Sequence, residues 1–141
     1  MFAEKKKTRI AGLHVNDSKP VVGEEVIVSG YVQFYDDKAK RWEPLRTWVR
    51  LYVDGVEVDR TASKPNGSFE FRYSSRITGK RKVEVRFAGD ERFKPCRKEI
   101  FIEIVTKEQK VKAERLAKIV LVLFFLLIAL VFVLSIAFSK W

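Results

Sequence analysis

The chain has 141 residues, of which 28 are Lys or Arg and 18 are Asp or Glu, so its formal net charge is +10 and its pI is near 9.8. This length allows one small domain with its own core ahead of the apolar C-terminal run, and the single cysteine, Cys96, excludes an internal disulfide. A positive net charge is typical of proteins that bind nucleic acid or anionic lipid, and it also increases solubility. Next to a membrane segment, attraction to anionic lipid headgroups is the simplest of these three explanations.

The soluble part, residues 8–105, predicts an all-β fold. Residues 1–7 are basic and lack the apolar stretch of a signal peptide, so we expect an N-terminal tail there. Beyond it, apolar and polar residues alternate with a period of two, which predicts strands separated by turn residues. The expected strands cover 8–15, 24–34, 47–53, a segment beginning at 56, 68–73, 82–87 and 98–105. Seven short strands in a domain of this size favour a two-sheet sandwich.

The dipeptide Asp54-Gly55 predicts a two-residue hairpin turn of the type that needs positive φ. In a regular register this turn pairs Val53 with Val56 and Leu51 with Val58, so that the apolar faces of the two strands match.

The alternation also assigns an inward face and an outward face to each strand. Arg72 and Arg86 face outward on the sheet opposite the one that holds Trp48, Arg50 and Tyr52, and we expect cross-strand ion pairs with Glu70 and Glu84. The inward residues are Val26, Val28, Gly30, Val32, Phe34, Val49, Leu51, Val53, Phe69, Phe71, Val83, Val85, Phe87, Ile100, Ile102 and Ile104.

Residues 31–48 interleave aromatic with basic side chains and form the least usual part of the domain. The insert 36–45 predicts a long hairpin loop or an additional edge strand. Aromatic and basic residues together are typical of surfaces that bind single-stranded nucleic acid, lipid headgroups or protein. The alternative is that Trp42 and Leu45 fold over the end of a sheet as part of the core. The candidate partner-binding residues are Tyr31, Tyr35, Trp42, Trp48, Arg50 and Tyr52.

Four segments carry a family resemblance: Pro20 to Gly30, Val49 to Gly55, Asn66 to Phe71, and Gly79 to Pro95. They resemble the prokaryotic immunoglobulin-like repeats, which are similar to the transthyretin-like regulatory domains attached to carboxypeptidases. The resemblance covers residues 8–105 and implies an immunoglobulin-like, seven-stranded sandwich that serves as a binding, spacer or scaffold module. It supplies no catalytic residues. Such repeats usually occur outside the cell and in tandem, whereas this chain has one copy and no export signal.

The C-terminal part predicts one continuous helix with a basic juxtamembrane segment (106–118), a membrane span (119–138) and a short tail (139–141). Thr106 and Gln109 fit a capping box at its start. The span carries no charge, no Pro and no Gly, and twenty residues at about 1.5 Å each give roughly 30 Å, the thickness of a bilayer core. The residues expected to anchor the chain are Lys112, Arg115, Lys118, Ile119, Phe138, Lys140 and Trp141.

The charges around the span predict that the domain lies in the cytoplasm. Five basic residues occur in 107–118 and only Lys140 follows the span, which under the positive-inside rule places the N-terminal side in the cytoplasm. Without a signal peptide this predicts a tail-anchored protein. Asn16 and Asn66 each begin an Asn-X-Ser sequon, which favours the alternative of an extracytoplasmic, glycosylated domain. Both sequences are also good turns.

No constellation of residues indicates catalysis, a cofactor or a metal site, so we do not expect an enzyme. His14 is the only histidine and lies in a predicted strand, where it lacks the partners that a triad or zinc site needs. Cys96 lies in a predicted loop beside Arg97 and Lys98, whose charges favour a lowered thiol pKa, but it has no defined catalytic partner. The acidic pairs at 36–37 and 90–91 lack the six or more oxygens that a Ca²⁺ site requires.

These observations favour a single-pass, membrane-anchored interaction or scaffold module, an accessory part of a membrane protein complex, whose partners are the lipid bilayer and another protein. Two alternatives remain open. The first is a basic membrane-surface domain that binds anionic lipid headgroups or, with less support, nucleic acid. The second is a cell-envelope domain that serves in adhesion or as a spacer.

Overall fold

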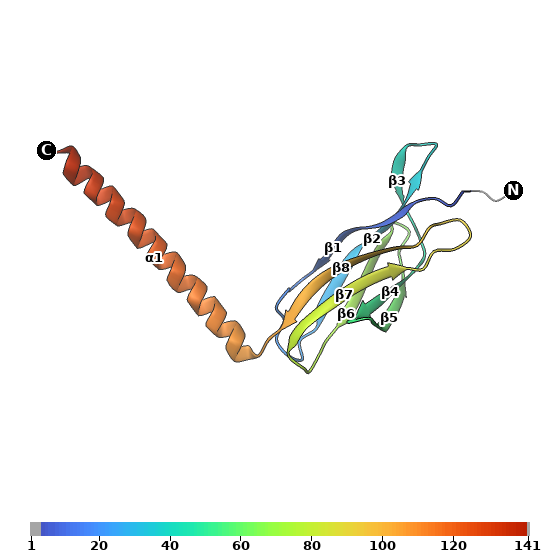
Figure 1. Cartoon of the computed structure of the whole chain (residues 1–141), viewed down its shortest axis with the longest axis horizontal. Coiled ribbons are helices and arrows are strands. Elements are labelled where there is room, and N and C mark those ends of the chain that lie inside the picture. The colour runs from blue at the N-terminus through green and yellow to red at the C-terminus, as the bar shows by residue number, and fades with distance from the viewer. Residues whose placement is uncertain (1–3, 141) are drawn as a thin grey trace. The chain divides into compact units, whose positions relative to one another are not determined.

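The computed structural model describes residues 4–140, and the chain divides into two compact units between Val105 and Thr106. The part described contains eight strands and one helix, one strand more than the seven expected (Figure 1). The additional strand is β3, in the insert. The elements are β1 (Thr8–Val15), β2 (Val26–Asp36), β3 (Arg41–Pro44), β4 (Trp48–Val53), β5 (Val56–Ala62), β6 (Ser68–Tyr73), β7 (Gly79–Phe87), β8 (Cys96–Ile104) and α1 (Lys107–Ser139).

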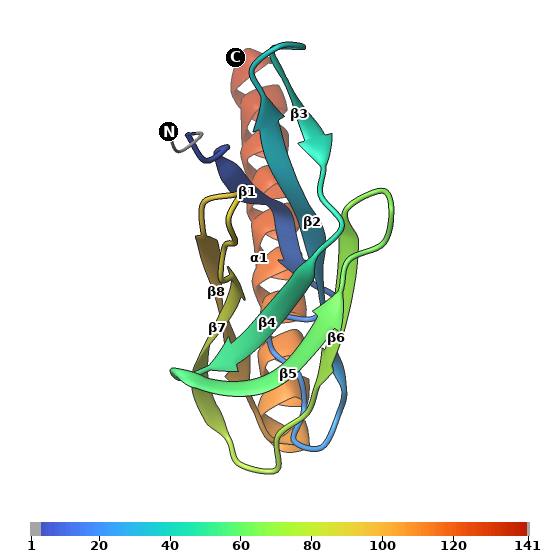
Figure 2. The same ribbon diagram turned by 90° about the vertical axis from the view of Figure 1, so that its right-hand side faces the viewer.

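The strands form two sheets of four, in which every pair of named strands is antiparallel. In the first sheet, β1 pairs with one side of β2, and β6 and β3 pair with the other side, one after the other along its length (Figure 2). The second sheet has the order β5-β4-β7-β8. The long β2 therefore pairs with two strands on one of its sides, which is how the insert becomes an edge strand rather than a loop.

One hydrophobic core lies between the two sheets, and it confirms most of the inward faces predicted from the alternation. Phe34 and Ile100 are only partly buried at its margin. The buried apolar residues come from both sheets and from the loops: Ile10, Val26, Val28, Val32, Leu45, Val49, Leu51, Val53, Phe69, Phe71, Val83, Val85, Phe87, Phe93, Ile102 and Ile104. Apolar burial from both sheets is what holds a two-layer sandwich together.

Val32 marks the point where β2 changes partner. Its N–H donates to the carbonyl of Gly67 at 2.9 Å, and its own carbonyl accepts from the N–H of Leu45 at 3.0 Å. Gly67 has φ +83°, and a Cβ on it would lie only 2.7 Å from the Val32 carbonyl oxygen. Glycine is required here both for its backbone conformation and for the close approach of two chains.

A buried serine fixes the crossing from the first sheet to the second. Ser63 is 2% exposed. Its hydroxyl donates to the Leu45 carbonyl at 2.7 Å and accepts from the Thr47 N–H at 2.9 Å. The polar groups of the crossing segment are thereby satisfied inside the protein, as burial requires.

The hairpin between β4 and β5 confirms the predicted turn but not the predicted register. Asp54 and Gly55 have φ values of +50° and +84°, and Val53 pairs with Val56. Leu51, however, pairs with Asp59 and not with Val58, because β5 holds one extra residue at this point. The prediction of a regular hairpin is wrong at this β-bulge, which moves every later residue of β5 by one position relative to β4.

The N-terminal segments lie along the sandwich. Within the range 1–7, predicted as a tail, Lys6 donates to the Arg92 carbonyl and accepts from the Lys94 N–H, both at 2.9 Å. Further on, Val105 donates to the Pro20 carbonyl at 3.0 Å and forms a parallel bridge with Val21. The main chain is thus hydrogen-bonded to the sandwich before β1 and after it.

The second unit is the helix α1. Thr106 accepts from the N–H of Gln109 at 3.1 Å, and the Gln109 side chain accepts from the Thr106 N–H at 3.0 Å, which confirms the capping box. The helix ends at Ser139, one residue beyond the predicted span. It is the one helix within residues 4–140 that is long and apolar enough to cross a membrane. Of the predicted anchor residues, Trp141 lies outside the described part.

Candidate interaction surfaces

The six residues predicted as one partner-binding surface lie on two opposite faces of the sandwich. Tyr31 and Tyr35 on β2, with Trp42 on β3, lie on the outer face of the first sheet, because the alternate residues of β2 are buried. The residues from β4 lie on the outer face of the second sheet, because Val49, Leu51 and Val53 face the core. We name the first group (Tyr31, Tyr35, Trp42) the aromatic surface and the outer face of the second sheet the basic surface.

The side chains of the aromatic surface are largely engaged with one another. The rings of Tyr35 and Trp42 meet edge to face, with centroids 5.4 Å apart. The Arg9 guanidinium lies 4.1 Å from the Trp42 ring and donates to the Gln33 side chain at 2.8 Å. Trp42 is half-buried in this cluster, whereas Leu45 joins the core, so the alternative role predicted for this pair is right for Leu45 alone.

The basic surface contains four arginines in register across all four strands of the second sheet. Arg60 on β5 pairs with Arg50 on β4, Arg50 pairs with Arg86 on β7, and Arg86 pairs with Arg97 on β8. We name this line the arginine row. Side chains that oppose each other on neighbouring strands have Cβ atoms about 4.5–5.5 Å apart, and like charges in this position destabilise a sheet.

A line with three acidic residues runs beside the arginine row, two residues away along β4, β7 and β8 and three residues away along β5, where the bulge lies. Glu57 pairs with Tyr52, Tyr52 pairs with Glu84, and Glu84 pairs with Glu99, so we name this line the glutamate row. The two rows are linked by Arg60 and Glu57 at 2.9 Å and by the close pair of Arg86 with Glu84. The predicted pairing of Arg86 with Glu84 is confirmed, although it runs along one strand rather than across two. Arg72 pairs with Glu25, not with Glu70.

The four arginines of the row differ in how closely carboxylates neutralise their charge. Arg50 reaches Glu57 only at 4.0 Å, and within residues 4–140 Arg97 forms no ion pair. Arg86 is the best-held member, because its guanidinium also lies 4.1 Å from the ring centre of Tyr52. The row therefore carries positive charge that its own sheet leaves without a close carboxylate, most of all at Arg97.

Glu84 points outward but is only 4% exposed, because the side chains around it cover it. The hydrogen bond from Arg86 lowers the pKa of Glu84 and outweighs the burial that would raise it. Glu84 is thus ionised in the neutral range and holds Arg86 in place.

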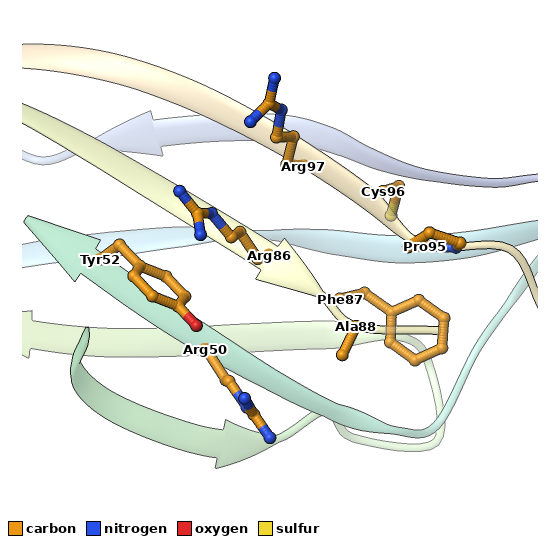
Figure 3. A pocket seen from close by; sticks show the side chains of 8 residues that line it. All are labelled: Arg50, Tyr52, Arg86, Phe87, Ala88, Pro95, Cys96 and Arg97. Atoms are coloured by element: carbon orange, nitrogen blue, oxygen red, sulfur yellow. The ribbon is translucent and has the colours of Figure 1, made fainter. Parts of the chain in front are cut away.

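A hollow of about 410 Å³ adjoins the arginine row where β7 ends and β8 begins. In Figure 3, Arg97, Arg86 and Tyr52 follow one another across three strands, while Ala88 and Pro95 lie at the far end of the hollow. Two large apolar side chains stand exposed on the same face: Trp48 is 63% exposed and Phe101 is 62% exposed. The face therefore combines uncompensated arginines, an apolar hollow and exposed aromatic rings.

The remaining single residues of interest have structural contacts. The nitrogens of His14 lie 2.8 Å from the Gly12 carbonyl oxygen and 3.0 Å from the Ser29 hydroxyl. Cys96 is the first residue of β8 and does not lie in the predicted loop. It is partly buried, and burial raises the pKa of its thiol rather than the adjacent basic residues lowering it. Among the residues that the structure describes, no group of three or more His, Cys, Asp or Glu could hold a metal ion.

Comparison with known proteins gives one relationship that covers both units. The chain is 40% identical over 133 residues to an uncharacterized protein of Archaeoglobus fulgidus, and the alignment spans 94% of this chain and 89% of the relative. No family model matches the sequence. No solved structure matches it either.

Proposed function

We propose that this chain, which belongs to the same family as the Archaeoglobus fulgidus protein, is a single-pass, membrane-anchored interaction module without catalytic activity. Its sandwich binds a partner protein as an accessory part of a membrane complex. The observation that carries this proposal is the basic surface, where exposed Trp48 lies beside Arg50 of the arginine row and Tyr52 lies on the other side of that row. Trp, Tyr and Arg are the residues that contribute most often to the binding energy of protein interfaces.

We assign the sandwich to the immunoglobulin-like class, with β3 as an addition to it. Without β3, the first, second and fifth strands pair in one sheet and the third, sixth and seventh pair in the other, as in immunoglobulin domains. The remaining strand, β5, pairs with β4 instead of β6. This order supports the resemblance to prokaryotic immunoglobulin-like repeats, which serve as binding or spacer modules.

The membrane anchor in this proposal is α1. Its residues 119–138 are uncharged, and a helix of this length matches a bilayer core. Lys112, Arg115 and Lys118 precede the span and Lys140 follows it, and such long basic side chains extend from helix ends toward headgroups.

We place the sandwich on the cytoplasmic side. The excess of Lys and Arg before the span supports this side, and so do the contacts of both sequon asparagines. The Asn16 side chain accepts from the Ile27 N–H at 2.8 Å, and the Asn66 side chain accepts from the Ser68 N–H at 3.0 Å. The Asn66 amide therefore acts in a local turn, whereas the Asn16 amide links the end of β1 to β2 and not to the turn expected from its sequence. Both asparagines thus have a structural role without glycosylation.

The side of the membrane is testable with a single thiol. Cys96 is a poor probe, because it is partly buried and its pKa is raised. In a Cys96→Ser chain, Lys64→Cys places a thiol at an exposed turn. We expect an impermeant thiol reagent to label it only after lysis. Labelling of intact cells would support the alternative cell-envelope domain instead.

Partner binding is testable by affinity capture of the full chain from membranes in mild detergent. Trp48→Ala with Tyr52→Ala should remove the captured partner, because both β4 rings of the basic surface are lost. The matched control, Tyr31→Ala with Trp42→Ala on the aromatic surface, should retain it. If the first variant recovers the same proteins as the unmodified chain, the basic surface is not the binding site.

The arginine row also favours a second candidate function, binding of phosphate groups in anionic lipid headgroups or nucleic acid. Such binding should weaken steeply as salt increases, because neutralising phosphates releases counterions. Binding to anionic vesicles or single-stranded RNA that is absent or insensitive to salt would remove this candidate.

A further inference from the structure

We infer that the partner of the basic surface is a second copy of this chain, packed face to face through the second sheet. The inference rests on the proposed function, because it names the partner of the surface that the proposed function uses. It starts from the order of charges on that face, where a complete row of arginines lies beside a row that contains three glutamates.

The two rows are complementary to each other under a two-fold rotation. They lie about 7 Å apart, since two residues along a strand rise about 3.3 Å each. A two-fold axis parallel to the rows and midway between them places each strand over the same strand of the second copy. The arginine row of each copy then lies over the glutamate row of the other, which is the reciprocal arrangement that a symmetric dimer interface requires.

Arg97 and Glu99 on β8 gain most from this arrangement. Within residues 4–140 Arg97 has no ion pair, whereas the side chain of Glu99 is 50% exposed and forms an ion pair with Lys82 at 3.2 Å. The rotation brings Arg97 of each copy opposite Glu99 of the other, twice per dimer. A guanidinium can bind a carboxylate through two parallel hydrogen bonds, which makes this pair directional as well as attractive.

The apolar groups fit the same rotation. Phe101 lies two residues beyond Glu99 on β8, on the side of the glutamate row away from the arginines, and is 62% exposed. The hollow extends over the arginine row to its opposite side, where Ala88 and Pro95 line its far end (Figure 3). The axis that superposes the charge rows therefore directs Phe101 of each copy toward the hollow of the other.

A second copy explains the face better than a membrane surface does. An anionic bilayer would cover both rows at once, and its charge would oppose the glutamate row. A second copy offers both signs of charge at the same spacing, with an apolar group beyond each row. Four strands about 4.8 Å apart and seven residues of about 3.3 Å give a face of roughly 450 Å². This is smaller than the ~800 Å² per partner of a standard interface, so we expect a weak dimer.

The test is a charge exchange at Arg97 and Glu99 in the full chain. Two copies with different affinity tags are produced in the same membrane, and one tag is captured in mild detergent. Arg97→Glu presents two acidic residues to its own copy, and Glu99→Arg presents two arginines. Each variant should therefore recover its own second tag on the order of tenfold less than the unmodified chain does.

Two combinations of these substitutions restore opposite charges across the interface and should therefore restore association. A chain with Arg97→Glu produced with a chain carrying Glu99→Arg should co-purify to within about twofold of the unmodified pair, because acid again faces base. The double variant Arg97→Glu/Glu99→Arg should also recover its own copy. Arg72→Glu is the matched control, since this exposed arginine lies on the first sheet, and it should leave recovery unchanged.

The inference is overturned if the unmodified pair does not co-purify, or if all pairs co-purify equally, since association would then involve another part of the chain. It is also overturned if the mixed pair fails although each variant retains its circular dichroism spectrum. In any of these cases, loss of a different captured protein by the Trp48→Ala/Tyr52→Ala variant would leave the proposed function standing. If no protein is captured either, both proposals fail.

Discussion

Replacing Gly67 by alanine tests the junction at which β2 changes partner. A Cβ at this position would lie 2.7 Å from the Val32 carbonyl oxygen and 3.2 Å from the Cβ of Pro44. Gly55 gives a matched control, because its φ is +84° against +83° for Gly67, but nothing lies within 4 Å of its Cβ position. The two substitutions share the backbone conformation and differ only in the space around it.

The expected loss in the free energy of unfolding is the sum of two contributions. The left-handed conformation costs a non-glycine residue about 1–2 kcal/mol, and both variants lose this amount. Only Gly67→Ala adds overpacking, which typically costs about 1–3 kcal/mol. The added methyl group meets the backbone of Val32, which is itself hydrogen-bonded to Gly67. We therefore expect losses of ~2–5 kcal/mol for Gly67→Ala and ~1–2 kcal/mol for Gly55→Ala. The smaller entropy of the unfolded alanine chain offsets both equally.

The measurement is urea unfolding of the full chain in detergent, followed by tryptophan fluorescence. Trp141→Phe in every sample leaves Trp42 and Trp48, both on strands of the sandwich, as the reporters. The midpoint should fall further for Gly67→Ala than for Gly55→Ala. Equal losses would show that the close approach to Val32 contributes nothing and that the reasoning about the junction is wrong.

Three further predictions concern single contacts. Ser63→Ala should lower the free energy of unfolding by about 1–3 kcal/mol, because it removes two buried hydrogen bonds, and an unchanged urea midpoint would contradict this. Glu84 is expected to add stability above the ordinary carboxyl pKa, and this contribution should be lost as pH falls through the pKa lowered by Arg86. Glu84→Gln should therefore reduce the slope of stability against pH below about pH 4, and an identical slope would argue against the pair. Thr106→Ala should weaken the first turn of the helix by about 0.5–2 kcal/mol, measured as faster hydrogen exchange at the Gln109 amide, and unchanged exchange would contradict the cap.

Features with local causes were predictable from the sequence. The Asp54-Gly55 turn and the capping box at Thr106 each depend on residues two to three positions apart. The same is true of most buried faces, since alternation within one strand decides which residues point inward. The long helix follows from its uncharged run alone.

The sequence could not predict that the six candidate partner-binding residues lie on two different sheets. Tyr35 and Trp48 are thirteen positions apart in the chain, and both face outward, yet their strands belong to different sheets. Which sheet a strand joins depends on long-range pairing, which is not encoded in the residues of that strand. The conclusion that the six aromatic and basic residues share one surface fails for this reason.

The arginine row was missed for a related reason. Arg50 and Arg86 were predicted to face outward on opposite sheets, which is wrong, because they pair within one sheet. The alignment of four arginines across β5, β4, β7 and β8 depends on three separate registers. Arg97 could have been found, because Ile100 and Ile102 of the same strand are inward, which places odd-numbered residues outward. Arg60 could not, because the bulge in β5 is not signalled by any glycine at that position.

That bulge determines how relatives of this chain should be compared. Counted from the Asp54-Gly55 turn in a regular register, the residue opposite Arg50 is Asp59, and Arg60 would face the core beside Val49. Counted back from the pairing of Trp48 with Ala62, the residue opposite Arg50 is Arg60. The charge of this face in another member of the family therefore has to be read from the end of β5 and not from its turn. An alignment gap of one residue in that strand would exchange an acidic position for a basic one.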